Sequence, residues 1–382
     1  KEDIFAVMRI LESGTLWGIH HPEVTTFEEE FAKYCGTEYC LSSDSGTAAL
    51  HMAIAAAGVG PGDEVITTAF SFLASASCIL HHNGIPIFVD IDPKTFNINS
   101  SKIEEKITDR TKAILPVHLH GLPADMDEIN RIARKHNLVV IEDAAQAHGA
   151  EYKGKKTGNL ADMAAFSIMP GKNLPAGGEG GLFTTSDLNY RNKADMVRMF
   201  GEIIKKDEKR AYNAYTMGWN YRPNVMAMAF ARSQLKRLDE YTGIRQRYGD
   251  YFTKALKDIP GIVPPFVPED IKHVYHIYRI RFDPSQLGLD IEPGKFRIAL
   301  QEILNAEGVP LHEYLNNPIP GQSVFQTSEG YGKGCPWGCQ YARKVKYDIR
   351  DYPETLRVIE DSVIIGWFGN PQDKLELLDL YI

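Results

Sequence analysis

The sequence predicts an α/β fold, in which a large domain with a mainly parallel sheet flanked by helices precedes a smaller α+β domain. Strand and helix patterns alternate over the first two thirds of the 382 residues. Strands separated by helices imply right-handed crossovers and a parallel sheet covered on both faces. From about Arg198 the pattern changes to long helices and an alternating strand. A chain of this length is expected to form two domains, which we place at residues 1–245 and 246–382.

In the large domain, capping, turn and periodicity signals predict the elements. Thr26-Phe-Glu-Glu29 is a capping box that opens a helix ending near Cys35. The turn Gly60–Asp63 leads into a strand. The strands expected here are 39–42, 64–67, 85–89, 113–117, 138–141 and 164–168, and the other helices are 50–57, 75–82 and 126–136.

The last third of the chain has a different pattern of predicted helices and strands. Two long helices are expected at 224–238 and 243–256. The segment Val274–Phe282 alternates apolar and polar residues, which predicts an antiparallel strand with one face on a core. A helix at 293–307, a glycine-rich loop at 321–338 and a final helix at 373–380 complete the small domain.

Composition excludes several classes of protein. The net charge of −8 gives no reason to expect nucleic acid or an anionic membrane as a partner. No apolar stretch is long enough for a membrane helix, and no signal peptide is visible. The five scattered cysteines favour a reducing, cytoplasmic location. Because the chain opens at Lys1 in a helical pattern, we expect a short preceding piece to be missing.

The segment Val139–Gly181 carries the strongest chemical signal. An apolar run ends in Asp143, which places a carboxylate at the carboxyl end of a buried strand. Lys172 follows a turn at Pro170-Gly171, and a glycine-rich hairpin comes next. Pyridoxal phosphate requires an anionic partner for its pyridinium nitrogen and a lysine for its Schiff base. Each feature alone has an ordinary structural explanation, but their occurrence together and in this order favours this cofactor.

A phosphate site is expected at Ser45-Gly46-Thr47, which opens a helix after a strand. Backbone N–H groups and the helix dipole favour an anion there, and the two hydroxyls add donors. The same tripeptide is also an ordinary helix cap. It contributes to the cofactor hypothesis only in combination with Asp143 and Lys172.

With these segments in place, the chain resembles the DegT–StrS sugar aminotransferases, which are fold type I enzymes dependent on pyridoxal phosphate. The resemblance runs from about Gly14 to Leu238 and continues more weakly to the end. The segments that carry it are SGTAAL (45–50), GPGDEVITTAFSFLASA (60–76), PVHLHGLPADMDEI (116–129), EDAAQAHGA (142–150), FSIMPGKN (166–173) and GEGG (178–181).

The resemblance implies a role for each site residue. Lys172 would form the Schiff base and move protons, Asp143 would hold the pyridine nitrogen protonated, and Gln146 would contact the phenolic oxygen. Phe72 would stack on the ring, in a position where some members carry Trp. The phosphate would be held by Ser45, Gly46, Thr47 and Ser167.

Further residues are implied outside this core. Gly218–Arg222 resembles the family's G-x-N-Y-R, so Asn220 would reach the phosphate of a neighbouring subunit in a homodimer with shared sites. Pro310–Tyr314 resembles a Pro-Leu-His stretch, so His312 and Tyr314 would approach the sugar, although a buried loop histidine is an equal alternative. The tail 363–373 and the loop Gly334–Cys339 depart from the family pattern and leave the substrate open.

No metal is expected. His118 and His120 are expected to alternate on a strand, where we interpret them as structural because no third ligand is apparent. Cys335 and Cys339 are expected to form a structural loop, since no second cysteine pair or suitably spaced histidine accompanies them.

The sequence therefore predicts an aminotransferase that moves an amino group from glutamate or glutamine to a keto-sugar, for a polysaccharide or an antibiotic. A ketocyclitol aminotransferase and an enzyme like aminohydroxybenzoate synthase are the nearest alternatives. The family's dehydrase branch carries His in place of Lys172. A non-catalytic regulator or partner subunit that binds the cofactor is the alternative from another class. The presence of Lys172, Asp143 and Gln146 together argues against it, as does the lack of an appended DNA-binding module.

Overall fold

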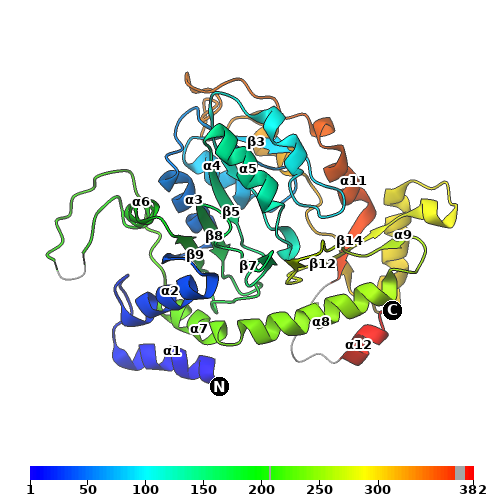
Figure 1. Ribbon diagram of the computed structural model, residues 1–382, viewed down its shortest axis with the longest axis horizontal. Helices are drawn as coiled ribbons and strands as arrows, with labels where there is room; N and C mark the ends of the chain where they lie inside the picture. Colours follow the sequence, from blue (N-terminus) through cyan, green and yellow to red (C-terminus); the bar gives the residue numbers. More distant parts are fainter. Residues whose placement is uncertain (206–207, 366–374) are drawn as a thin grey trace.

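A seven-stranded sheet forms the centre of the computed structural model, which describes residues 1–205, 208–365 and 375–382 (Figure 1). The strand order is β1-β9-β8-β5-β4-β2-β3. Neighbours from β3 to β8 are parallel, and β9 runs antiparallel to both β8 and β1. The strands are β1 (Tyr39–Ser43), β2 (Glu64–Thr68), β3 (Ile85–Val89), β4 (Thr111–Leu115), β5 (Val139–Asp143), β8 (Met163–Ser167) and β9 (Gly181–Thr185). The mainly parallel sheet predicted from the sequence is confirmed.

Helices bury both faces of this sheet. On one face, Leu41 and Phe183 pack in a cluster with α3 (Gly46–Ala56). On the other, Cys40 and Leu182 pack with α2 (Pro22–Cys35) and α7 (Val225–Leu235). Successive strand residues point to opposite faces, so these short apolar runs are buried on both sides. The other helices of this part are α1 (Glu2–Ser13), α4 (Ala74–His81), α5 (Met126–His136) and α6 (Leu188–Arg198).

The C-terminal part is built on a four-stranded antiparallel sheet in the order β10-β12-β14-β13. Its strands are β10 (Ile262–Val263), β12 (Tyr278–Phe282), β13 (Leu311–His312) and β14 (Ser362–Ile365). Its helices are α8 (Leu238–Leu256), α9 (Pro293–Ala306), α10 (Ser323–Thr327), α11 (Pro353–Asp361) and α12 (Leu375–Asp379). In Figure 1, α8 runs along the lower edge from α7 to this sheet.

A small third sheet was not predicted. It contains β6 (Glu151–Tyr152), β7 (Lys155–Lys156) and β11 (Ile271–Lys272) in the order β11-β6-β7. Because β11 comes from the C-terminal part of the chain, this sheet joins two distant segments. Strands of two residues carry no periodic signal, so sequence patterns miss them.

Several predicted boundaries are wrong. The helix expected to start at the Thr26 capping box starts at Pro22, where the His21 side chain accepts from the Glu23 N–H at 3.1 Å. The strand expected over Val274–Phe282 begins only at Tyr278. Residues before it instead bond to a loop of the large part, with the Val274 N–H donating to the Gly121 carbonyl at 3.0 Å. Backbone partners that lie far away in sequence override the alternating pattern.

Other differences are smaller. The helices expected at 224–238 and 243–256 are α7 and α8, and the break between them comes earlier, at residues 236–237. The strand expected at 113–117 is β4, which ends at Leu115. His118 and His120 therefore lie beyond the strand rather than alternating on it. Residues 366–374 lie outside the described residues, and with them most of the tail 363–373 and the start of the helix expected at 373–380.

Candidate active site

Asp143 is the last residue of β5 and is buried at the carboxyl end of the sheet. One carboxylate oxygen accepts from the Ser75 hydroxyl at 2.7 Å, and the other accepts from the Ala145 N–H at 3.2 Å. Burial raises the pKa of Asp143, and these bonds together with the charge of Lys172 oppose that rise. The carboxylate is thus held in place while still facing a cation.

Lys172 approaches from the neighbouring strand. β8 pairs with β5 and ends at Ser167, and the chain then turns so that the Lys172 N–H donates to the Met169 carbonyl at 2.9 Å. Burial lowers the pKa of Lys172, and the attraction of Asp143 opposes this effect. A lowered pKa increases the neutral fraction of the amine, which is the form that attacks a carbonyl.

The N-terminus of α3 forms an anion cradle beside these two residues. Ser45 caps the helix, its hydroxyl accepting from the Ala48 N–H at 3.1 Å. The first N–H groups of a helix have no partner within the helix. A Cβ on Gly46 would lie 2.5 Å from the Ser167 Cβ, so only glycine allows β8 and α3 to approach this closely. Ser45, Gly46, Thr47 and Ser167 therefore surround one small space suited to a phosphate.

Gln146 follows Asp143 by three residues, and Phe72 lies just before α4. Gln146 is buried, and its side-chain oxygen Oε1 accepts from the His120 N–H at 2.8 Å. This bond orients the amide so that its nitrogen remains a donor. Phe72 is 60% exposed, which leaves its ring available to stack on a ligand.

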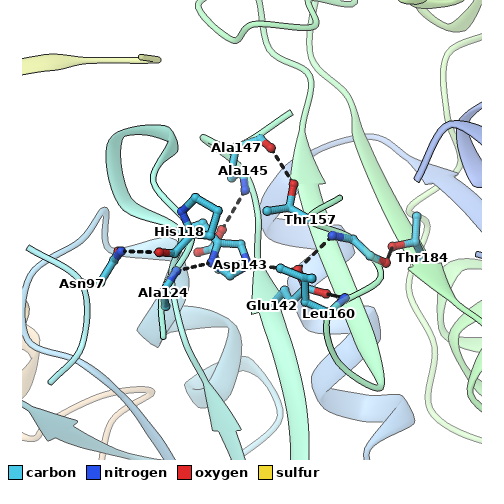
Figure 2. Close-up of polar contacts among 12 residues, drawn as sticks. Asn97, His118, Ala124, Glu142, Asp143, Ala145, Ala147, Thr157, Leu160 and Thr184 are labelled. Carbon is cyan, nitrogen blue, oxygen red and sulfur yellow. Dashed lines mark hydrogen bonds and ion pairs between the residues drawn. The ribbon is translucent and has the colours of Figure 1, made fainter. Parts of the chain in front are cut away.

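Glu142, next to Asp143, lies on the opposite face of β5 (Figure 2). Its fully buried carboxylate accepts from the N–H groups of Gly158 and Leu160, at 2.9 and 2.7 Å, and contacts His118 at 2.9 Å. His118 Nδ1 accepts from the Ala124 N–H at 3.1 Å, so the ring proton lies on Nε2 and is donated to Glu142. His118 thus has a structural role, as expected.

Further histidines near Lys172 were missed by sequence reasoning. His148 is buried and packs on Phe166, and burial followed by the charge of Lys172 lowers its pKa to about 3. His276 lies in the segment that replaces the expected strand, 3.4 Å from the Asn173 side-chain oxygen. Burial and Lys172 also lower the pKa of His276 well below its usual value. Burial and the charge of Lys172 thus disfavour the protonated form of both rings. No local pattern in the sequence places them beside the lysine.

The C-terminal part contributes Tyr314. Its carbonyl accepts from the buried Arg279 guanidinium at 2.8 Å, and Arg279 Nε donates to His120 at 2.9 Å. Burial raises the pKa of Tyr314, the charge of Arg279 opposes the rise, and the charge of Asp143 adds to it. His312 lies exposed on β13.

Asn220 is exposed, and its side-chain oxygen accepts from Arg222 Nε at 2.8 Å. It lines a cavity of about 800 Å³ together with Trp17, Asp44 and Gly178. Asn220 thus shares this cavity with Asp44, the residue that precedes Ser45.

Over residues 1–205, 208–365 and 375–382, no group of three histidine, cysteine or acidic side chains is arranged to hold a metal ion. None of the helices in these ranges has the length and apolar character needed to cross a membrane.

With this geometry, the chain belongs to the DegT/DnrJ/EryC1/StrS aminotransferase family, whose model matches residues 1–346. It is an aminotransferase, and its cofactor is pyridoxal phosphate. The predicted family and cofactor are confirmed.

Individual relatives sharpen this picture. The chain is 42% identical over 281 residues to dTDP-3-amino-3,6-dideoxy-α-D-galactopyranose transaminase of Aneurinibacillus thermoaerophilus, covering 74% of this chain and 75% of that one. It is 38% identical to a pleiotropic regulatory protein of Geobacillus stearothermophilus, covering 89% and 87%. The crystal structure of 3-amino-5-hydroxybenzoic acid synthase has a TM-score of 0.86 at 30% identity, covering 100% of this chain and 94% of that chain.

Proposed function

We propose that this protein transfers an amino group from glutamate or glutamine to the keto group of a sugar, in the biosynthesis of an amino sugar. The observation that carries the proposal is the pairing of Asp143 and Lys172 at adjacent strand ends, beside the cradle at Ser45. Bound pyridoxal phosphate supplies an electron sink for the carbon that gains or loses the amino group.

Each side chain has a defined task. Asp143 keeps a proton on the pyridine nitrogen, and its burial strengthens this charge interaction. Lys172 Nζ, as a neutral amine, would bond to the carbonyl carbon of the cofactor with loss of water. Once the incoming amine displaces it, Lys172 Nζ would take the proton from the substrate carbon and return it. The Gln146 amide would donate to the phenolic oxygen of the cofactor, and the Phe72 ring would cover one face of it. The phosphate is bound by Ser45, Gly46, Thr47 and Ser167.

Tyr314 and His312 are the proposed sugar contacts from the C-terminal part. Tyr314 is supported by its position, because its ring lies 6.2 Å from the His120 ring, and the His120 N–H donates to the Gln146 side chain. His312 lies two residues earlier, exposed on β13, and is the weaker assignment.

We further propose a homodimer with shared sites, in which Asn220 of one subunit contacts the phosphate in the other. Several large apolar side chains near Asn220 are exposed, which supports a protein–protein contact. They include Trp17, Tyr212, Tyr215 and Met217, between 61% and 77% exposed. Figure 1 shows the described residues between α6 and α7, which exclude 206–207, projecting from the body of the molecule.

The protein is proposed to act in the cytoplasm, as two domains, residues 1–245 for the cofactor and 246–382 for the substrate side. All five cysteines are unpaired, which agrees with a reducing compartment. The separate antiparallel sheet supports the division of the chain.

The test is an absorbance spectrum of the protein loaded with pyridoxal phosphate, before and after L-glutamate or L-glutamine. Loss of the visible band and gain of a near-ultraviolet band identifies the donor. The protein with its cofactor in the aminated form is then mixed with a dTDP-linked keto-deoxyhexose or, separately, with a ketocyclitol. Return of the visible band with the sugar supports the proposal, and return with the ketocyclitol alone contradicts it.

The similarity to 3-amino-5-hydroxybenzoic acid synthase favours one second candidate, an aromatising enzyme. That candidate predicts an aromatic ultraviolet spectrum in the product, which a sugar product lacks. The relative from Geobacillus stearothermophilus is named a pleiotropic regulatory protein. A regulator that binds the cofactor without turnover predicts a visible band that neither donor alters.

A further inference from the structure

A cluster of aromatic and imidazole rings lies against α3. His51, fully buried on this helix, is at its centre. Its Nδ1 lies 2.9 Å from the Tyr221 hydroxyl and its Nε2 lies 3.0 Å from His82 Nδ1. The Trp219 ring packs on the His51 ring at 4.5 Å, edge to face. None of these four residues belongs to the proposed cofactor chemistry.

The rings anchor one side of an extended segment, residues 219–222. Trp219 and Tyr221 face His51 and are half-buried, and their rings stack at 6.2 Å and 10°. Asn220, between them, is exposed and lines the cavity beside Asp44. Neighbouring side chains of extended chain point to opposite sides, so fixing the two aromatic rings fixes the direction of Asn220.

Backbone bonds attach the same segment to the large part. The Trp219 N–H donates to the Val197 carbonyl at 2.8 Å, and the Tyr221 N–H donates to the Arg198 carbonyl at 3.1 Å. The Tyr221 carbonyl accepts from the Asp44 N–H at 3.2 Å. Asp44 directly precedes the Ser45 cradle, so this bond joins the segment to the start of α3.

One helix therefore supports two functional elements. The first residues of α3 form the phosphate cradle of their own subunit, and His51, in its second turn, holds the segment that carries Asn220. Burial, followed by the neighbouring rings of His82 and His81, lowers the pKa of His51 to about 3. The neutral ring has one donor and one acceptor nitrogen, which serve Tyr221 and His82 together.

We propose that His51 is a positioning residue, which acts through Tyr221 to aim Asn220 at the phosphate bound by the partner subunit. This inference rests on the shared site of the proposed function. His51 thus serves the active site of the partner subunit. The helix that carries it, α3, forms the phosphate cradle of its own subunit.

The first experiment measures the dissociation constant of pyridoxal phosphate from the apoenzyme of Tyr221→Phe. Removing this one hydroxyl is expected to weaken binding about five- to tenfold, the usual effect of losing one hydrogen bond. Tyr190→Phe is the matched control. Tyr190 lies near the start of α6, whereas Arg198, whose carbonyl accepts from the Tyr221 N–H, is the last residue of that helix. An unchanged constant in Tyr221→Phe overturns the inference.

Two substitutions of His51 separate positioning from packing. His51→Asn keeps a polar group near the Nδ1 position and can still bond Tyr221, whereas His51→Leu cannot. We expect near-normal affinity in the first and about tenfold weaker binding in the second. Equal loss in both contradicts a role through Tyr221. If His51→Leu fails to fold, His51→Asn and Tyr221→Phe still decide the question.

Mixed dimers test which site is served. Tyr221→Phe subunits are combined with Lys172→Ala subunits, and the visible band of lysine-bound cofactor reports only the site that keeps Lys172. That site receives its Asn220 from the partner with an intact Tyr221, so normal affinity is expected. Weak binding there overturns the inference.

The same design with Asn220→Ala in place of Tyr221→Phe tests the proposed function itself. Weak binding in the Asn220→Ala homodimer together with normal affinity in the mixed dimer shows that Asn220 acts across the interface. If affinity is normal with Asn220→Ala but weak with Tyr221→Phe, only the role of His51 fails. If it is weak with Asn220→Ala too, the shared site fails and the inference with it.

Discussion

Glu142 and Asp143 are adjacent carboxylates on β5, and their surroundings differ. Glu142 points away from the candidate site. On that other side of β5 it accepts from two backbone N–H groups and from the His118 ring. Asp143 points into the site, where its bonds to Ser75 and Ala145 leave it facing Lys172. Both side chains are buried, so burial alone does not mark the catalytic one.

The difference shows how one strand serves stability and chemistry at once. A buried carboxylate with several donors stabilises the fold and holds neighbouring loops. A buried carboxylate that faces a lysine retains its charge for a ligand, at a cost to the stability of the empty protein. The predictions below separate these two roles by substituting each residue in turn.

The largest effect is expected for Lys172→Ala. Without the amine there is no Schiff-base nucleophile and no base at the substrate carbon, so transamination falls at least about a thousandfold. Cofactor binding stays measurable, because the cradle and Asp143 remain. Steady-state rates and equilibrium binding check this, and near-normal turnover would remove Lys172 from its role.

Asp143→Asn is expected to lower the rate about a hundred- to a thousandfold, since a preorganised charge contributes several kcal/mol to the transition state. Single-turnover measurement of the half-reaction with the donor tests this. An unaffected rate would mean that another carboxylate serves the pyridine nitrogen.

Asp143→Asn, which lowers the rate, is expected to raise the stability of the apoenzyme. Burial raises the folded-state pKa of Asp143 above 3.8, so its contribution to stability is present at low pH and lost as pH rises. An uncharged asparagine avoids that loss. The apoenzyme of Asp143→Asn should melt at a higher temperature than the wild type at neutral pH, with the difference shrinking toward pH about 4. A lower melting temperature at neutral pH would contradict this.

Gly46→Ala is expected to weaken cofactor binding about tenfold. The added Cβ would lie 2.5 Å from the Ser167 Cβ and force apart two walls of the cradle. Gly243→Ala, on α8 with no atom nearer than 3.7 Å to the added Cβ, is the matched control and should leave binding unchanged. Titration of the apoenzyme with pyridoxal phosphate distinguishes the two, and equal binding in both would refute the cradle.

The smallest effect on catalysis is expected for Glu142→Gln. The amide disturbs a network with His118 and two N–H groups, which should lower the free energy of unfolding by about 1–3 kcal/mol. Turnover per folded molecule should stay within about threefold of the wild type. Denaturant unfolding and activity of the folded fraction measure the two quantities, and a catalytic loss like that of Asp143→Asn would erase the distinction.

Much of the site could be predicted because it depends on short-range order. Asp143 follows an apolar run, and the Ser45 tripeptide opens a helix after a strand. Strand ends of a parallel sheet meet at one edge, so the residues there converge once the strands are recognised. The roles of Glu142 and Asp143 could not be separated this way, since the difference lies in donors from residues 158 and 160.

The remainder depends on contacts between distant segments. His276 reaches the lysine loop only because Val274–Ile277 leaves the strand that its alternating pattern predicts. Arg279 bonds to both His120 and Tyr314, which lie 159 and 35 residues away from it in the sequence, respectively. No local periodicity encodes such pairs, and the same holds for His51 and Tyr221, which are 170 residues apart.

The most direct test of the division between the two carboxylates is the ¹⁵N chemical shift of the pyridine nitrogen in bound, labelled pyridoxal phosphate. We predict a protonated nitrogen in the wild type and in Glu142→Gln, and an unprotonated nitrogen in Asp143→Asn. A nitrogen that stays protonated in Asp143→Asn, or that loses its proton in Glu142→Gln, would contradict the account.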